Sequence, residues 1–430
     1  MTTRRRRALP GAVLVALLAL AVPATASAAG TWVSSSAPIG ANRSCSSPGF
    51  NSVQAALNAA GSEANIKVCG GTYEEQLEVT KPAKIVLATG SGTAKLAMPS
   101  SPAESKTSCD TAIPGGQTDE VSICTTGKID LSGVTIEALA PITTCVGALN
   151  GINVGGGAEL KAENDTIVGA STTLNDIKGC QKGIAVLVGS HKASVVGHAM
   201  LKGDTISGYE KNGPTVVGSG STMKVIDTTV TGEGPSPYIA QNGIEIAYGA
   251  KGDVKGGSVS GNECELAAIC SSTDYENQAD GVLFYGAAAG SGVSGTTVSN
   301  NDIGVYYASA SATVPASPDV KITKDQLTND RYEGVLLEEG KALLSGDTIS
   351  GSGELGIALF QASSQESASE SSATKATIEG MSKAAIGVIT DGSAGDKAGT
   401  FTIKNSSISK NAAEVSDPSS NFTIVKKNDS

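Results

Sequence analysis

The chain has 430 residues, of which 40% are hydrophobic and only 3% aromatic, and its formal net charge is −11. This acidic balance argues against nucleic acid or an anionic membrane surface as a partner. The length would ordinarily predict two or three domains. No linker-like change of composition divides the chain, however, so we expect a single elongated domain over residues 30–430.

Residues 1–29 have the pattern of a secretory signal peptide. A basic run at Arg4–Arg7 precedes an apolar core at Leu14–Val22 that is too short to span a membrane, and small residues at 24–28 offer cleavage sites. Without this segment the chain keeps 27 basic against 42 acidic residues, a net charge of about −15. No second apolar run of transmembrane length follows. We therefore expect a secreted, extracellular, monomeric protein whose mature chain has no membrane anchor.

Residues 45–87 predict an N-terminal cap followed by a first coil. Over Phe50–Ala60 the apolar side chains recur at helical spacing, which predicts a short amphipathic helix. Ile66–Val68 and Glu74–Val79 are predicted strands on either side of a turn. A solenoid has an open hydrophobic end, and a helix of this kind would cover it.

This stretch resembles the N-terminal entry of the pectin-lyase-like right-handed parallel β-helix superfamily. The pattern in that superfamily is an aromatic-x-(Ser/Thr)-(Ile/Val)-Gln-x-Ala helix followed by Gly-Thr-Tyr-x-Glu. Phe50 to Ala56 and Gly71 to Glu75 match it. The resemblance implies the fold but not an activity, since many enzymes and many non-enzymes share this cap.

One hexapeptide, Gly-Asp-Thr-Ile-Ser-Gly, occurs at 203–208 and again at 346–351, and looser copies run through most of the chain. Its central apolar residue recurs at ten anchor positions that lie 22 to 39 residues apart: Ile136, Ile167, Ile206, Val230, Val259, Val298, Leu327, Ile349, Ile378 and Ile408. Each copy contains β-branched residues and alternates between inward and outward positions. Most copies end in Gly or Asn, which suit a turn at positive φ. The minimum period of 22 fits three short strands and three turns. With the resemblance, this predicts an all-β chain folded as a single right-handed parallel β-helix of about ten or more coils.

All eight cysteines follow the signal segment, and an even number in an exported chain predicts disulfides. Each coil of a solenoid contacts only its neighbours, so we expect local pairs. The predicted pairs are Cys45–Cys69, Cys109–Cys124, Cys145–Cys180 and Cys264–Cys270. A metal site is not predicted, because there is no Cys-x-x-Cys and the only histidines, His191 and His198, fit ordinary surface or turn positions.

Residues 361–374 are polar, Ser-rich and of low complexity. This composition predicts a mobile loop. The repeat resumes after it, so we expect a loop within the solenoid and not a boundary between domains.

Gly-apolar dipeptides follow the anchors, from Gly243-Ile244 to Gly387-Val388. If the apolar residue points inward, alternation turns the second and fourth residues after each glycine outward. The row of second residues is Glu245, Leu283, Tyr306, Leu336, Ala358 and Ile389. The row of fourth residues is Ala247, Tyr285, Ala308, Glu338, Phe360 and Asp391. Sugar rings stack on flat aromatic surfaces, so Tyr285, Tyr306, Glu338 and Phe360 are the predicted substrate-binding residues. The alternative is that loops cover this face and the aromatic rings are ordinary packing.

Asp280 and Asp302 lie 22 residues apart, which is one minimal coil, and stacked carboxylates can act as general acid and base. The spacing faintly resembles the motifs of polygalacturonase-like glycoside hydrolases. This chain lacks their Asp doublet, Gly-His-Gly and Arg-x-Lys, and Arg331 is the only arginine nearby. Asp280, Asp302 and Arg331 are therefore weak catalytic candidates. The alternative is that Asp280, Asp302 and Asp330 are turn residues.

Three functional hypotheses follow. The first, which we favour, is a secreted β-helix that binds extracellular polysaccharide without catalysis. The second is a polysaccharide lyase or glycoside hydrolase acting on pectin-like glycans, with Ca²⁺ as a possible cofactor of a lyase. The third is a structural or adhesive solenoid. The sequence identifies no cofactor, and it leaves the substrate and the question of catalysis open.

Overall fold

The structure is a computed structural model. It describes residues 30–430 except 114, 146, 175–177, 266–269, 271–277, 309–319, 339–340, 352, 362–370, 391–398, 418–421 and 430. The predicted signal segment, residues 1–29, lies outside the described residues. No helix within the described ranges is long and apolar enough to cross a membrane.

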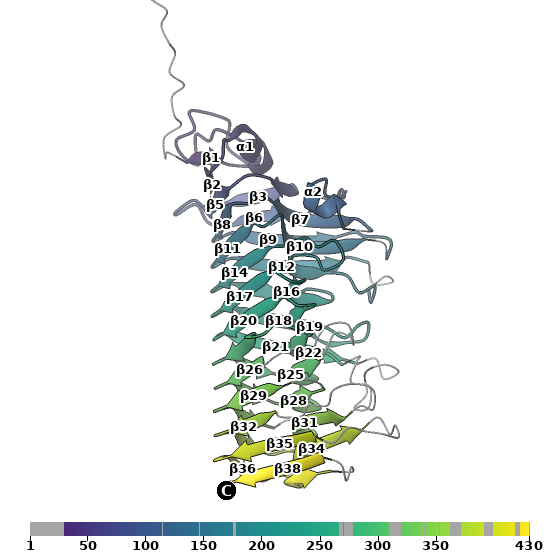
Figure 1. Ribbon diagram of the computed structural model, residues 1–430. Helices are drawn as coiled ribbons and strands as arrows, with labels where there is room; N and C mark the ends of the chain where they lie inside the picture. Colours follow the sequence, from purple (N-terminus) through teal and green to yellow (C-terminus); the bar gives the residue numbers. More distant parts are fainter. Residues whose placement is uncertain are drawn as a thin grey trace, which may run out of the picture.

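The strands of the described residues form three long parallel sheets that run the length of the molecule (Figure 1). Each coil adds one strand to each sheet, as in the passage from β2 through β3 and β4 to β5. We call the sheets 1, 2 and 3 in the order in which a coil visits them.

Sheet 1 contains fourteen strands. They are β1 (Thr31–Val33), β2 (Ala64–Val68), β5 (Ala83–Leu87), β8 (Lys128–Ser132), β11 (Glu159–Glu163), β14 (His198–Lys202), β17 (Thr222–Ile226), β20 (Lys251–Lys255), β23 (Gly292–Ser294), β26 (Val320–Thr323), β29 (Ala342–Ser345), β32 (Ser372–Thr374), β35 (Gly399–Lys404) and β38 (Phe422–Lys427). Because Gln361 is the last residue of β31 and residues 372–374 form β32, both ends of the predicted Ser-rich loop lie in strands, and 362–370 lie outside the described residues.

Sheet 2 contains twelve strands, including most copies of the hexapeptide motif. They are β3 (Gly71–Glu74), β6 (Ala94–Ala97), β9 (Thr135–Ala140), β12 (Thr166–Thr172), β15 (Thr205–Ser207), β18 (Thr229–Ser236), β21 (Ser258–Cys264), β24 (Thr297–Ser299), β27 (Gln326–Thr328), β30 (Thr348–Ser350), β33 (Thr377–Glu379) and β36 (Ser407–Ser409).

Sheet 3 also contains twelve strands. They are β4 (Leu77–Val79), β7 (Gln117–Cys124), β10 (Ala148–Gly155), β13 (Ile184–Val188), β16 (Asn212–Val217), β19 (Asn242–Ala247), β22 (Asp280–Tyr285), β25 (Ile303–Ala308), β28 (Glu333–Leu337), β31 (Leu355–Gln361), β34 (Ala384–Thr390) and β37 (Val415–Ser416).

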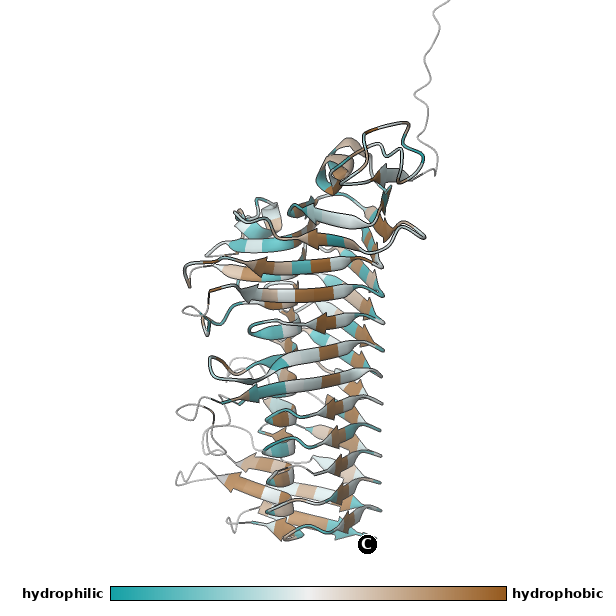
Figure 2. Ribbon diagram, turned by 180° about the vertical axis from the view of Figure 1, so that it is seen from behind, coloured by the Kyte–Doolittle hydropathy of each residue, from teal (hydrophilic) through white to brown (hydrophobic). Residues whose placement is uncertain are grey.

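The anchor residues stack on one another inside the solenoid, as the repeat predicts. Ile167 lies opposite Ile136 on one side and Ile206 on the other, and the pattern continues to Ile408. Nine of the ten anchors are at most 1% exposed and belong to one continuous core cluster, against which Ile408 of the last coil packs partly buried. Figure 2 shows apolar positions recurring at matching places in successive strands. The predicted β-helix is confirmed.

The aspartate of the hexapeptide joins one coil to the next. Asp347 accepts hydrogen bonds from the backbone N–H of Asp325 and of Ser345, both at 2.9 Å. Asp325 likewise accepts a hydrogen bond from the backbone N–H of Thr296 in the preceding coil. These carboxylates satisfy backbone donors that the turns between sheets 1 and 2 would otherwise leave unpaired.

Helix α1 (Val53–Ala59) lies at the N-terminal end of the stack (Figure 1). It is shorter than the predicted segment, because Ser52 has extended backbone and its hydroxyl accepts from the Ala55 N–H, which makes it the N-cap. The helix buries Val53, Ala56 and Leu57 against the core cluster of the coils.

All four predicted disulfides are present: Cys45–Cys69, Cys109–Cys124, Cys145–Cys180 and Cys264–Cys270. The second closes a short excursion that carries helix α2 (Ser108–Thr111) and ends at β7. Four disulfides fit a protein of an oxidising, non-cytoplasmic compartment.

Candidate functional site

The outer face of sheet 3 carries the rows of side chains that alternation predicts. Pairing aligns Glu245, Leu283, Tyr306, Leu336 and Ala358 across five successive strands. The sixth member is Gly387, not Ile389.

The error at β34 has a local cause. Gly356 of β31 is the glycine at the start of the usual dipeptide, and its counterpart in β34 is Ala385. Gly387, which resembles such a glycine in the sequence, therefore lies two residues further along. Ile389 aligns with Phe360 instead, and Asp391 lies outside the described residues.

The C-terminal half of this face is apolar and closely packed. Tyr306 is only 6% exposed, Leu336 and Ala358 are fully buried, and all three belong to a second hydrophobic cluster. The Tyr306 hydroxyl donates to the Glu338 carboxylate. Of the predicted aromatic residues, Tyr285 and Phe360 remain half-buried at the edge of this cluster. Tyr306 is thus packed, in keeping with the alternative interpretation of the sequence.

Asp302 and Arg331 meet in a turn between sheets 2 and 3. One Asp302 oxygen accepts from the backbone N–H of Cys264 and of Ala279, each at 3.1 Å, and the other lies 2.6 Å from Arg331 Nη2. Arg331 also donates to the Cys264 carbonyl. Burial raises the pKa of Asp302 to about 6, although the two N–H donors and Arg331 oppose the rise. With its partners inside the turn, this pair fits a structural role.

Asp330 also lies in a turn. It accepts from the backbone and from the side-chain amide of Asn301. Asn301 in turn accepts from Asn262, which accepts from the Tyr209 hydroxyl at 2.6 Å. This buried ladder crosses four coils and ties their turns together.

Asp280 lies apart from these turns, at the start of β22 on the outer face. Its side chain is 2% exposed, and within the described residues its Oδ1 has no hydrogen-bond partner. Burial raises its pKa well above the usual range, Lys211 opposes the rise, and Asp302 and Glu245 add to it. All three weak catalytic candidates carry a polar atom without a hydrogen-bond partner among the described residues, namely Asp280 Oδ1, Asp302 Oδ1 and Arg331 Nε, but Asp302 and Arg331 form an ion pair with each other.

Four further residues complete a polar cluster around Asp280; the sequence predicts that one of them, Glu245, faces outward, but none of the four was predicted as a site residue. We call Lys211, Asn212, Thr215, Glu245 and Asp280 the central polar cluster. They come from β16, β19 and β22 and from the residue before β16. Asn212 donates to the Glu245 carboxylate, and Lys211 donates to the Ala240 carbonyl at 2.8 Å.

The central polar cluster is buried but not satisfied. Asn212 is 5% and Thr215 2% exposed, and neither Asn212 Oδ1 nor Thr215 Oγ1 has a partner among the described residues. Burial lowers the pKa of Lys211 and raises that of Glu245, while their mutual attraction opposes both shifts. Lys211 and Glu245 are the two members that stay partly exposed. Unpaired buried polar atoms are rare in native proteins, and they mark this cluster as a ligand site to test.

One sequence signal could have found the cluster. Asn212-Gly213, Asn242-Gly243 and Asp280-Gly281 open three successive strands of sheet 3, and pairing aligns Asn212, Asn242 and Asp280. Gly243 and Gly281 were recognised as strand markers and Gly213 was not, and of the polar residues before these glycines only Asp280 was named as a candidate.

A second polar group lies nearer the N-terminus of the same face, over β7 and β10. Asn153 donates to Asp110 at 2.6 Å, and Asn150 donates to Asp119 at 2.6 Å. A cavity of about 250 Å³ adjoins Asp119 and Ser122. Both carboxylates accept from neighbouring side chains, unlike Asp280 Oδ1, although Asn150 Oδ1 has no partner among the described residues.

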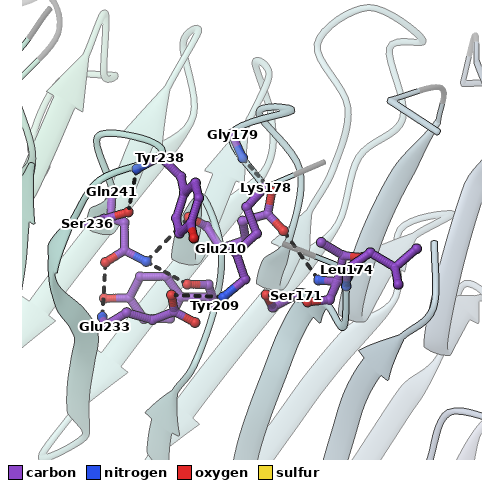
Figure 3. A network of polar contacts seen from close by, with 11 residues as sticks. Ser171, Leu174, Lys178, Gly179, Tyr209, Glu210, Glu233, Ser236, Tyr238 and Gln241 are labelled. Atoms are coloured by element: carbon purple, nitrogen blue, oxygen red, sulfur yellow. Dashed lines mark hydrogen bonds and ion pairs between the residues drawn. The ribbon is translucent and has the colours of Figure 1, made fainter. Parts of the chain in front are cut away.

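The loops beside the central polar cluster are tied together by the network in Figure 3. Glu210, the residue before Lys211, accepts from the backbone N–H of Thr172 and of Gly179. Gln241 donates to the Tyr209 carbonyl at 2.7 Å. These contacts hold the end of β12 and the residue before β19 beside the start of β16, and so fix the backbone that carries Lys211.

No metal or cofactor site emerges from the residues that the structure describes. Among them, no group of three or more His, Cys, Asp or Glu side chains could hold a metal ion.

Comparison with known proteins supports the fold but shows no function. No protein family and no curated protein matches the sequence. Among solved structures, the periplasmic alginate epimerase AlgG is similar with a TM-score of 0.53 and 10% identity over 85% of this chain and 76% of that one. The A-module of the Azotobacter vinelandii mannuronan C-5 epimerase AlgE4 has a TM-score of 0.53 and 10% identity over 86% and 94%.

XylC in complex with xylose has a TM-score of 0.53 and 9% identity over 93% of this chain and 86% of that one. At such identities the likeness shows the fold, a right-handed parallel β-helix. The fold hosts epimerases of alginate and mannuronan, but an activity must be argued from the site.

Proposed function

We propose that this protein is secreted and binds an extracellular polysaccharide on the outer face of sheet 3, at the central polar cluster. The observation that carries the proposal is the set of unsatisfied buried atoms Asn212 Oδ1, Thr215 Oγ1 and Asp280 Oδ1. A buried polar group without a partner costs free energy, and a bound ligand that supplies the partner recovers it. The ligand would enter beside Lys211 and Glu245, which are the partly exposed members.

The chemistry of these atoms favours a neutral, hydroxyl-rich glycan. Two of the three are acceptors only and require a donor, and the third is a hydroxyl. Sugar hydroxyls donate, whereas the carboxylates of a pectin-like or alginate-like glycan do not.

A second candidate function is glycoside hydrolysis. The observation that favours it is the pair Glu245 and Asp280 on adjacent strands, both with raised pKa values. A carboxyl group that keeps its proton near neutral pH can act as a general acid. A Ca²⁺-dependent lyase has less support, because Arg331 already pairs with Asp302.

The test is a glycan screen of residues 30–430 that reads binding and product release on neutral, pectic and alginate-like polysaccharides, with and without Ca²⁺. The variants are Asn212→Ala and Asp280→Asn. The matched control is Asp253→Asn, which makes the same change on β20 of sheet 1.

Binding to a neutral glycan that both site variants lose and the control keeps would support the proposal. Release of oligosaccharides, abolished in Asp280→Asn, would make the protein a hydrolase. Equal binding by all four proteins would overturn the assignment of the site. If no glycan is bound or cleaved, the hypothesis of a structural or adhesive solenoid remains.

A further inference from the structure

We infer that His191, Tyr248 and Tyr285 form an aromatic platform on which one pyranose ring of the glycan stacks. This inference rests on the proposed function and adds a subsite to it. The rings of His191 and Tyr248 are stacked, with centroids 4.4 Å apart and planes 10° apart. Tyr285 meets Tyr248 edge to face at 5.5 Å.

The three rings come from different coils, and an intervening turn leaves room for them. His191 follows β13, Tyr248 follows β19 and Tyr285 ends β22. The turn after β16, between His191 and Tyr248, carries no ring. Its Gly218 has a φ of +89°, and a Cβ there would lie 3.2 Å from the backbone of His191. Because residue 218 is a glycine, His191 can lie over the turn after β16 and its ring can reach Tyr248.

Tyr248 occupies a position where glycine is the ordinary choice. Pairing places it level with Gly218 and Gly286, whose φ values are +89° and +62°. Tyr248 itself has a φ of +53°. An aromatic side chain in this left-handed region is unusual and strained. Its N–H donates to the Tyr285 carbonyl at 3.0 Å, which holds the turn. A strained aromatic residue between two glycines indicates that the ring itself is needed.

The platform is open and borders the central polar cluster. His191 is exposed and Tyr248 and Tyr285 are half-buried, in contrast to the buried Tyr306. Glu245 lies three residues before Tyr248, and its charge adds to the burial that raises the pKa of Tyr248. An exposed ring face, such as that of His191 backed by Tyr248, lies next to hydrogen-bond acceptors and matches a pyranose, which has an apolar C–H face and a rim of hydroxyl donors.

The chain provides a direct readout, because it has only two histidines. His191 is in the platform, whereas His198 is on sheet 1, where its Nδ1 lies 2.9 Å from Thr222 Oγ1. The ring-proton NMR signals of both would be followed during titration with cellohexaose and maltohexaose, two neutral hexasaccharides, and with a galacturonate hexamer. The His191 signals are expected to shift with a neutral hexasaccharide while the His198 signals stay in place.

The decisive variant is Tyr248→Gly, which relieves the backbone strain and so should fold at least as well as the parent. It is expected to bind the neutral hexasaccharide about tenfold more weakly, the order of one lost aromatic contact. His198→Gly, which removes a ring from β14 of sheet 1, is the control and should bind normally.

Two outcomes would overturn the inference in distinguishable ways. Glycan binding that Asp280→Asn abolishes, with His191 unshifted and Tyr248→Gly unimpaired, would remove the platform and leave the proposed function. No binding of any hexasaccharide or polysaccharide would remove both.

Discussion

At the level of single residues, the two identical hexapeptides differ in what their aspartates contact. Asp347 accepts two backbone hydrogen bonds, one from the preceding coil and one from its own turn. Asp204 accepts one from Asp165 at 2.8 Å, and its other oxygen has no partner in the described part of the chain. The same sequence therefore contributes unequally to stability in two coils.

We expect Asp347→Ala to lower the free energy of unfolding by about 2–3 kcal/mol and Asp204→Ala by about 1–2 kcal/mol, because each lost acceptor leaves a buried N–H unpaired. Urea denaturation of the two variants measures this difference. Asp253→Ala, on the outer surface of sheet 1, is the control. Equal losses at 347 and 204 would contradict the argument from hydrogen bonds.

A second residue-scale prediction concerns Glu120, a fully buried side chain whose two oxygens have no partner among the described residues. It aligns with Gly151, in a row that small residues occupy in most later strands. Burial raises its pKa to about 9, and the charges of Glu75 and Glu137 add to the rise. The folded protein therefore holds a proton at this site that the unfolded chain releases near pH 4.5.

The stability due to Glu120 should accordingly be lost as pH rises from about 5 to about 9. Glu120→Gln removes this loss, and at pH 8 it should be more stable than the parent by a few kcal/mol, at about 1.4 kcal/mol per pKa unit. Denaturation midpoints at pH 5 and pH 8 test this, with the exposed Glu159→Gln as control. A parent and variant with the same pH dependence would rule it out.

At the level of elements, helix α1 depends on a residue outside it. The two oxygens of Glu75 accept from the backbone N–H of Val53 at 2.6 Å and of Gln54 at 3.0 Å. These N–H groups have no partner within the helix, and a negative charge there also complements the helix dipole.

Glu75→Gln is expected to lower the free energy of unfolding by about 1–2 kcal/mol. It should also speed amide hydrogen exchange in α1 and the adjoining β2, while exchange in the C-terminal coils stays unchanged. Hydrogen exchange read by mass spectrometry resolves these regions. Glu74→Gln, the exposed neighbour, is the control. Unchanged exchange in α1 would show that the helix does not need Glu75.

The strands and their inward residues could be predicted from the sequence because one period governs them. Every anchor obeys the same alternation, so ten copies reinforce one interpretation. The register of β34 could not be predicted, because Gly387 resembles the glycine of the repeat while Ala385 takes its place. The burial of Tyr306 could not be predicted either, since its packing against Leu336 and Ala358 depends on three coils together.

At the scale of the whole molecule, the candidate site depends on stacking that no single repeat encodes. His191 and Tyr248 are 57 positions apart in the sequence and belong to different coils, yet their rings stack. Lys211 and Asp280 likewise meet only through the pairing of β16, β19 and β22. Asp280 was accessible to sequence reasoning because it begins a strand, whereas its neighbours come from three coils. The repeat thus predicts the outer face of sheet 3, but the side chains that meet on this face depend on how successive coils stack.

The same stacking predicts how the whole solenoid responds to pH. Burial raises the pKa of Asp165 and Asp325 to about 7 and of Asp204 and Asp347 to about 6, while backbone donors oppose each rise. The folded chain thus binds more protons than the unfolded chain between about pH 4 and pH 7. The free energy of unfolding should therefore rise as pH falls from 8 to 5.

The measurement is a series of urea denaturation midpoints between pH 8 and pH 5, made in the Glu120→Gln background so that this separate group does not contribute. Acidification also reduces the net negative charge of the chain, which would itself change the stability. High salt limits this second effect, because it screens exposed charges more than buried ones. Replacing Asp165 and Asp325 by Asn should reduce the slope between pH 5 and pH 8, since two of the groups whose pKa is raised by burial are then removed. A midpoint that falls on acidification, or a slope that the double variant preserves, would mean that these carboxylates stay ionised in the folded solenoid and that their backbone donors outweigh burial.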